Sequence, residues 1–201
     1  MIEKIRQEGH EINWQDHDSI IKFYESNQLF FDNYKLINDQ DEIADIIHMK
    51  IHYINALNAK KRFSKALNIL PQVDDLIEKL DPNSDKYEKF RTDRLFYYGM
   101  LKGNLKDFKT SYSTFSKLIK IDPENDLYKN WYLAMKINLQ YEYLKYGSIL
   151  GLIIVLGDII ADLAFGFKLD NRIVLFGWIL MLVCWLGPQV YKFLKKKGCL
   201  K

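Results

Sequence analysis

Hydrophobic positions in the first two thirds of the chain recur at the spacing of helices. Between residues 41 and 57, apolar side chains fall three or four positions apart, which places them on one face of an α-helix. Segments 63–80, 105–119 and 128–143 repeat this spacing, and no alternating pattern typical of a β-strand competes with it. The sequence therefore predicts an all-α fold class.

Prolines mark where these helices bend or end. Pro71 lies inside the segment 63–80 and predicts a kink, because proline removes a backbone donor from the helix. Asp-Pro-Asn-Ser at 81–84 and Asp-Pro-Glu-Asn at 122–125 are turn sequences that end the helices before them. The segment 128–143 continues without proline into the apolar part of the chain, so we expect one helix to enter it.

Two apolar runs occupy the last third of the chain, at about 148–167 and 173–191. Each is close to the roughly 20 residues that a helix needs to cross a hydrocarbon core about 30 Å thick. The second run holds no charged residue and carries Trp178, Trp185 and Tyr191, whose rings suit membrane interfaces. This run predicts a transmembrane helix.

The first run contains two carboxylates, Asp158 and Asp162. Each costs roughly 2.5 to 3.5 kcal/mol near the centre of a membrane helix, and the aliphatic residues of the run offset about that much. Alone, the run would insert marginally. We therefore expect the two runs to insert together, as a transmembrane hairpin whose second helix carries the first.

Charge predicts the orientation of this hairpin. The net charge is +3, and the last ten residues hold no acid and the five lysines Lys192, Lys195, Lys196, Lys197 and Lys201. Cytoplasmic flanks of membrane helices are enriched in lysine and arginine, so the C-terminus is expected in the cytoplasm. Two spans return the chain to its starting side, and the first residues lack the apolar stretch of a signal peptide. We expect an integral protein of a bacterial inner membrane with both termini cytoplasmic.

The same patterns predict four regions. Residues 1–40 form an N-terminal helical cap, 41–145 a cytosolic helical domain, 146–192 the transmembrane hairpin and 193–201 a basic tail. The aromatic residues of the cap fit either a packed core or a groove that faces a partner. Apart from the tail the chain is slightly acidic, which argues against a nucleic-acid partner.

Two helix pairs end in Asp-Pro turns whose prolines, Pro82 and Pro123, lie about 40 residues apart. Matching residues are Leu95, Tyr98, Gly99, Gly103, Asn104, Phe115 and the closing Ile-Asp-Pro-Glu-Asn in 93–125, and Phe63, Ala66, Leu67 and Pro82 in 46–84. With these residues the chain resembles the tetratricopeptide repeat (TPR) family, in a degenerate form. Ser111 stands where that family has a small alanine, and the predicted helices are longer than those of its usual repeat of about 34 residues. The resemblance implies TPR-like helical hairpins with a concave protein-binding surface, and it implies no catalysis.

Candidate chemistry is sparse in this chain. His48 and His52 lie four residues apart on one predicted helix, one turn after Asp45, so they can share a metal ion or simply pack and contact solvent. The two cysteines, Cys184 and Cys199, are too few for a zinc site or a disulfide framework. Phosphate-binding loops and nucleophile motifs are missing from the sequence. We expect no enzyme and no cofactor.

Asp158 and Asp162 are the most informative polar residues, because ionisable groups within a membrane span face a protein or water interior. Lying four apart, they share one helix face. One hypothesis is a pore lining or a contact in a homo-oligomer, with Gly151 and Gly157 allowing close helix approach. The other is a local partner within the hairpin.

Two functions fit these expectations. The first is a membrane-anchored helical-repeat adaptor, or scaffold, that presents a protein-binding surface to cytosolic partners. The alternative is an oligomeric, pore-forming effector, such as those of bacterial defence, gated by its cytosolic helices. In both, the lipid bilayer is a partner.

Overall fold

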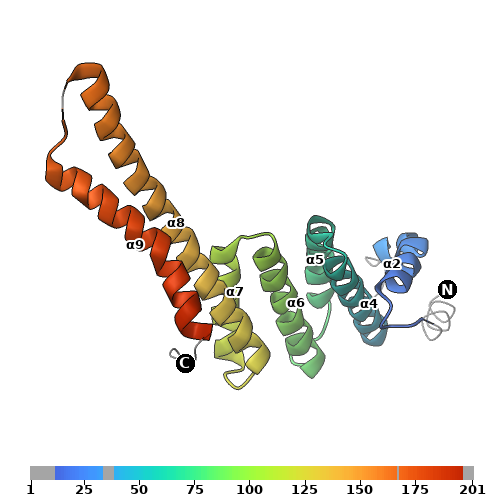
Figure 1. The fold of residues 1–201 in the computed structure, drawn as a ribbon. Coiled ribbons are helices and arrows are strands. Elements are labelled where there is room, and N and C mark those ends of the chain that lie inside the picture. The colour runs from blue at the N-terminus through green and yellow to red at the C-terminus, as the bar shows by residue number, and fades with distance from the viewer. Residues whose placement is uncertain (1–11, 34–38, 167, 197–201) are drawn as a thin grey trace. The chain divides into compact units, whose positions relative to one another are not determined.

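A computed structural model describes residues 12–33, 39–166 and 168–196, with side chains except at 165 and 188–196. Within these ranges the regular structure is helical and contains no strand, as the sequence predicted. The chain divides into two units, Met1–Met135 and Lys136–Lys201. The boundary falls inside helix α8, Asp126–Phe165, ten residues earlier than the predicted end of the cytosolic domain. Figure 1 shows the order of the helices.

The first helices of the described part of unit 1 are α2 (His17–Ser26) and α3 (Gln28–Asp32), which are short and lie in the region predicted to cap the helical domain. The next two helices, α4 (Gln40–Ala59) and α5 (Phe63–Ile77), form an antiparallel pair (Figure 1). The Asp39 carboxylate caps α4 by accepting hydrogen bonds from the backbone N–H groups of Asp41 and Glu42. Helix α5 runs through Pro71 without ending there.

A second pair follows, made of α6 (Asp85–Asn104) and α7 (Phe108–Ile121). Ser84 caps α6 and Asp107 caps α7, each through its side-chain oxygen. Helix α8 begins after the Asp-Pro turn at 122–125, where Asn125 accepts from the N–H groups of Leu127 and Tyr128. The turn sequences therefore end and restart the helices where the sequence placed them.

The two helix pairs share the same tight turn. Lys61 joins α4 to α5 and Lys106 joins α6 to α7, and both adopt a left-handed backbone, with φ of 59° and 66°. In each turn the next residue donates its N–H five residues back, from Arg62 to the Leu57 carbonyl and from Asp107 to the Lys102 carbonyl. This bond is the helix-ending arrangement that glycine usually serves.

Two hydrophobic cores hold unit 1 together. The larger one joins α2 through α6, and the stacked rings of Tyr24, Phe31 and Tyr53 lie in it. The smaller one joins α6, α7 and the start of α8 around Phe115, which stacks on Trp131 with ring centroids 5.4 Å apart. Met135 is the last residue of this second core, at the boundary between the units.

The larger core contains one buried amine. Lys50 is fully buried, and its ammonium donates to the Tyr24 hydroxyl at 2.8 Å and to the Gln72 amide oxygen at 2.6 Å. Burial lowers the pKa of Lys50 to about 8, although the nearby Asp32 carboxylate acts in the opposite direction. The charge is thus less favourable in the folded chain than in water.

Unit 2 contains the distal part of α8 and helix α9, Asn171–Lys196. The two helices are antiparallel (Figure 1) and approach closely at glycines. A methyl group added to Gly151 would lie 2.7 Å from the Gly177 carbonyl oxygen and 2.8 Å from the Met181 nitrogen. One turn earlier, a methyl group on Gly147 would lie 2.7 Å from the Cys184 sulfur. Only glycine permits this approach of two backbones.

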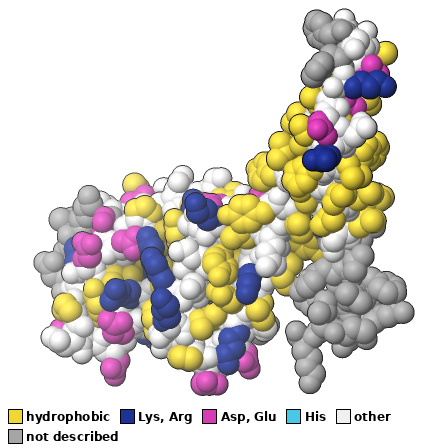
Figure 2. All heavy atoms as spheres, turned by 90° about the vertical axis from the view of Figure 1, so that its left-hand side faces the viewer, with side chains coloured by type: hydrophobic (Ala, Val, Ile, Leu, Met, Phe, Trp, Pro, Cys, Tyr) yellow, Lys and Arg dark blue, Asp and Glu magenta, His cyan; other side chains and the backbone are white. Residues whose placement is uncertain are grey.

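The outward surfaces of this helix pair are apolar. Ile153, Ile160 and Leu163 on α8 are 60, 61 and 83% exposed, and Leu175 and Val183 on α9 are 59 and 58% exposed. Figure 2 shows hydrophobic side chains gathered over this helix pair. Among the described residues, one helix is long and apolar enough to cross a membrane, and it is α8. In α9 the apolar stretch of described residues, Asn171–Gly187, is shorter.

Candidate functional site

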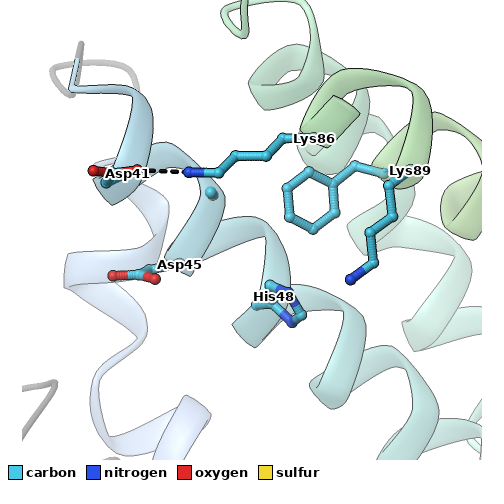
Figure 3. A pocket seen from close by; sticks show the side chains of 7 residues that line it. Asp41, Asp45, His48, Lys86 and Lys89 are labelled. Atoms are coloured by element: carbon cyan, nitrogen blue, oxygen red, sulfur yellow. Dashed lines mark hydrogen bonds and ion pairs between the residues drawn. The ribbon is translucent and has the colours of Figure 1, made fainter. Parts of the chain in front are cut away.

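An open pocket of about 500 Å³ lies between the first helices of the two helix pairs. Figure 3 shows it from close by. Helices α4 and α6 supply its lining, because residues three and four apart on each helix face the same side. The lining residues are Asp41, Ala44, Asp45 and His48 from α4, and Lys86, Lys89 and Phe90 from α6.

Charged groups of both signs surround the pocket. The Lys86 ammonium lies 2.6 Å from the Asp41 carboxylate and bridges the two helices at one end (Figure 3). This hydrogen bond raises the pKa of Lys86, so the amine stays charged. Lys89 extends from α6 on the side of His48 (Figure 3) and has no ion pair among the described residues. Phe90, which is 2% exposed, gives the pocket an apolar wall.

The two histidines proposed as metal ligands have aromatic neighbours instead. The His48 ring meets the edge of Phe90 with centroids 5.3 Å apart, and His52 lies 4.8 Å from the Trp14 ring. The centroids of the two imidazoles are 6.1 Å apart. Burial lowers the pKa of His52, and the neighbouring His48 acts in the same direction. Within the described chain, no three His, Cys, Asp or Glu side chains gather as a metal site would require.

Helix α6 continues from the pocket with half-buried titratable groups. Burial raises the pKa of Asp93, and the charges of Lys89 and His48 partly oppose that shift. Burial also raises the pKa of Tyr97 one turn later. These groups place a mixed polar and aromatic surface next to the pocket.

The two carboxylates of the first apolar run have local partners. The Asp158 carboxylate accepts a hydrogen bond of 3.0 Å from the backbone N–H of Leu169, and Asp162 lies 3.4 Å from the Lys168 ammonium. Both partners belong to the connection between α8 and α9. Asp158 and Asp162 lie one turn apart on α8, and the backbone donor of Leu169 has no side-chain signature in the sequence.

The two glycines proposed for helix packing have different surroundings. Gly151 lies against the backbone of α9, whereas a methyl group on Gly157 would meet nothing within 4 Å. Two close contacts that the sequence reasoning missed involve Gly147 and Gly177. Of the basic residues, Lys192, Lys195 and Lys196 belong to α9 but their side chains lie outside the described part, as do Lys197 and Lys201 entirely.

The pocket was also missed at the sequence level. Lys86, Lys89 and Phe90 have the spacing of one helix face, and that signal was available. Their position opposite Asp41 and His48 depends on contacts between residues more than 40 positions apart, which a single sequence does not display. No protein-family model, curated protein or solved structure matches the chain.

Proposed function

We propose that this protein is a membrane-anchored adaptor, with unit 1 as a TPR-like partner-binding domain in the cytoplasm and unit 2 as a membrane hairpin. The observation that carries the proposal is the continuous helix α8. Its first turns belong to the second core through Tyr128 and Met135, and its distal turns expose aliphatic side chains. A patch this apolar is stable where lipid, not water, surrounds it.

Details of α6 and α7 support the TPR-like interpretation. A methyl group on Gly99 would lie 3.0 Å from both Thr114 and Phe115, so the absence of a side chain lets the two helices approach. Ser111, at the position of the family's small alanine, is fully buried, and its hydroxyl donates to the Gly99 carbonyl at 2.7 Å. The serine thus keeps the small volume and satisfies its polar atom.

The pocket between α4 and α6 supports the binding role. The resemblance to TPR proteins implies a concave protein-binding surface, and the first helices of the two pairs line this pocket together. Lys89, with no ion pair among the described residues, and the Phe90 wall offer one cationic and one apolar contact to a bound segment.

The local partners of Asp158 and Asp162 favour an anchor over a pore lining. A carboxylate that already accepts from the Leu169 N–H is engaged by the turn of its own hairpin. A pore would instead need these oxygens turned toward a shared water path. The oligomeric effector therefore has less support than the adaptor.

Membrane anchoring is tested by alkaline extraction of membranes from cells that express the full chain. Ile153→Lys with Ile160→Lys places two charges on the exposed apolar part of α8 and is expected to release the protein into the soluble fraction. The matched control, Leu127→Lys with Leu133→Lys, changes equally exposed leucines of the same helix within unit 1 and should leave the protein in the membrane. Release of the wild-type chain would contradict the anchor.

Partner binding is tested by photo-crosslinking in the same cells. A photoreactive residue at position 48 faces the pocket, and one at position 117 occupies an exposed site on α7. The adaptor predicts a discrete crosslinked protein from position 48 that disappears with Lys89→Glu, and none from position 117. Equal crosslinking from both positions, insensitive to Lys89→Glu, would show that the pocket is not the binding surface.

A further inference from the structure

We infer that the hairpin of unit 2 fits a hydrocarbon layer markedly thinner than the usual 30 Å, so that its lipid partner is a thin bilayer. This inference rests on the proposed membrane insertion and specifies which bilayer the hairpin prefers. It follows from the register of α8 against α9 and from the positions of the charged residues along both helices.

Glycine contacts fix the register. Gly147 faces Cys184, Gly151 lies between Gly177 and Met181, and the side chain of Ile154 packs on Gly177. Residues of α8 that are nearer to the segment joining the two helices therefore face residues of α9 that are nearer to the same segment, and both helices advance at the same rate. By this register, Asp158 lies level with the beginning of α9, in agreement with its hydrogen bond to Leu169.

The end of the hairpin that carries the segment joining α8 to α9, which we call the far end, is polar from Asp158 onward. Asp158 and Asp162 contact the connecting segment, and Asp170 accepts from the Arg172 N–H at 2.7 Å. The connection also contains Lys168, which is exposed. Since charged residues of both helices begin at this level, the hydrocarbon layer must end here.

At the opposite, near end of the hairpin, the uncharged runs of the two helices differ in length. On α8 the first charged residue before the apolar run is Lys145, and the distance from Lys145 to Asp158 is about 20 Å at 1.5 Å per residue. On α9 the uncharged run from Arg172 to Lys192 extends about 30 Å. Helix α9 alone matches an ordinary bilayer, but the pair shares only about 20 Å of uncharged length.

Two exposed aromatic rings lie at the same near level. Tyr146 and Trp185 each lie one residue beyond the contact of Gly147 with Cys184, and they are 65 and 60% exposed. Tyrosine and tryptophan prefer the interface between lipid and water. A layer about 20 Å thick places both rings at its surface, whereas a layer of 30 Å places them inside the hydrocarbon.

The length of the flanking charged side chains decides how far the hairpin can adapt to a hydrocarbon layer thicker than its uncharged length. Lys145 has a long stem that points toward the start of α8, so its ammonium can reach the near interface and extend the usable length by about 5 Å. An aspartate is too short to do this, and its Cβ points away from the far surface. The preferred hydrocarbon thickness is therefore about 20 to 25 Å.

The test uses the full chain synthesised in the presence of phosphatidylcholine vesicles whose monounsaturated acyl chains have about 14, 18 or 22 carbons. Vesicles are floated, and the alkali-resistant fraction of the protein is measured. A modest penalty for each ångström of mismatch predicts at least about tenfold less inserted protein in the longest lipid than in the shortest. Asp170→Asn, a charge change in the connection, should keep this preference.

Two variants should move the preference toward longer lipids. Asp158→Leu with Asp162→Leu extends the uncharged run of α8 past the present limit, and Lys145→Leu extends it at the other end without touching the connection. Equal insertion in all three lipids, or best insertion in the longest, would overturn the inference while leaving the anchor intact. No insertion in any lipid would overturn the anchor itself.

Discussion

Helices α6 and α7 in unit 1 and helices α8 and α9 in unit 2 both approach at glycines, but different atoms fill the space beside them. Methyl groups on Gly99 and Gly103 would meet side chains, those of Phe115, Thr114, Met135 and Ser111. A methyl group on Gly151 would meet the backbone of the opposite helix. In unit 1 both glycines make room for side chains, whereas in unit 2 Gly151 brings two backbones together and Gly147 and Gly177 lie against side chains of the opposite helix.

The proposed insertion of unit 2 into a membrane accounts for this difference. In water, burial of apolar side chains drives packing, and unit 1 buries its rings in two cores. In lipid, neighbouring chains are as apolar as the protein, so helix association depends on close backbone packing at small residues. Unit 2 has that arrangement and keeps its aliphatic side chains outside.

The largest effect on stability should come from removing a large side chain from the second core of unit 1. Phe115→Ala removes a fully buried ring that stacks on Trp131, and a cost of about 4 kcal/mol in the free energy of unfolding is expected. Urea unfolding of the detergent-solubilised chain, followed by tryptophan fluorescence, measures it. If the two units are stabilised separately, the membrane-bound fraction stays unchanged; a parallel loss of insertion would break the comparison.

A smaller effect is expected from filling the closest contact of unit 2. Gly151→Val drives side-chain carbons into the backbone of α9 and should cost about 3 kcal/mol, because a backbone cannot rotate out of the way. The buried Cys184 reports helix separation through its alkylation rate in a Cys199→Ser background. Gly157→Val, where space is open, is the matched control. Similar alkylation of both variants would argue against the backbone contact.

The pH dependence of stability should belong to unit 1. The pKa of Lys50 is about 8 in the folded chain and near 10.5 when unfolded, so the unfolded chain binds more protons between these values and stability rises with pH. We expect a gain of about 2 kcal/mol between about pH 7.5 and 9.5. Above about pH 10 the buried Tyr53, whose pKa burial raises, reverses the trend.

Lys50→Met tests the origin of that gain, since it removes the titrating amine and keeps the length of the side chain. The slope of unfolding free energy against pH should then become flat between about pH 7.5 and 9.5. A slope that survives in Lys50→Met would assign the effect to another group.

The smallest effect concerns the matching turns of unit 1. Lys61→Gly and Lys106→Gly relieve a left-handed backbone that costs a side-chain-bearing residue about 1 kcal/mol, so each should stabilise unit 1 by about that amount. Thermal unfolding by circular dichroism measures the gain. Lys60→Gly, beside the first turn but with φ of −84°, should instead destabilise.

The sequence predicted those helices that bury one face. Helix α5 has buried apolar residues three and four apart, at Ala66, Leu70, Val73 and Ile77, because it packs mainly on one side. Helix α6 escaped a full prediction because Phe96, Tyr97 and Tyr98 are consecutive half-buried rings that point to different neighbours. With packing on several sides, no single apolar face appears in the sequence.

Contacts with the backbone were beyond sequence reasoning. The Asp158 carboxylate accepts from the N–H of Leu169, a group that every residue except proline carries, so no residue type in the sequence marks this partner. Likewise, Gly151 and Gly157 look equivalent in sequence, and only the position of α9 separates the packed glycine from the open one.

Helix α8 also couples two events during synthesis of the chain, completion of the second core and emergence of the apolar stretch. The residues that complete the second core, Trp131 and Met135, are made only a few turns before the apolar stretch that begins near Gly147. A domain that folds as the chain emerges cannot close this core until α8 has left the ribosome. If unit 2 is the proposed membrane anchor, its delivery to the bilayer begins as the domain finishes folding. A delay in folding then leaves the second core open, and a delay in delivery leaves the apolar surface of unit 2 exposed to water.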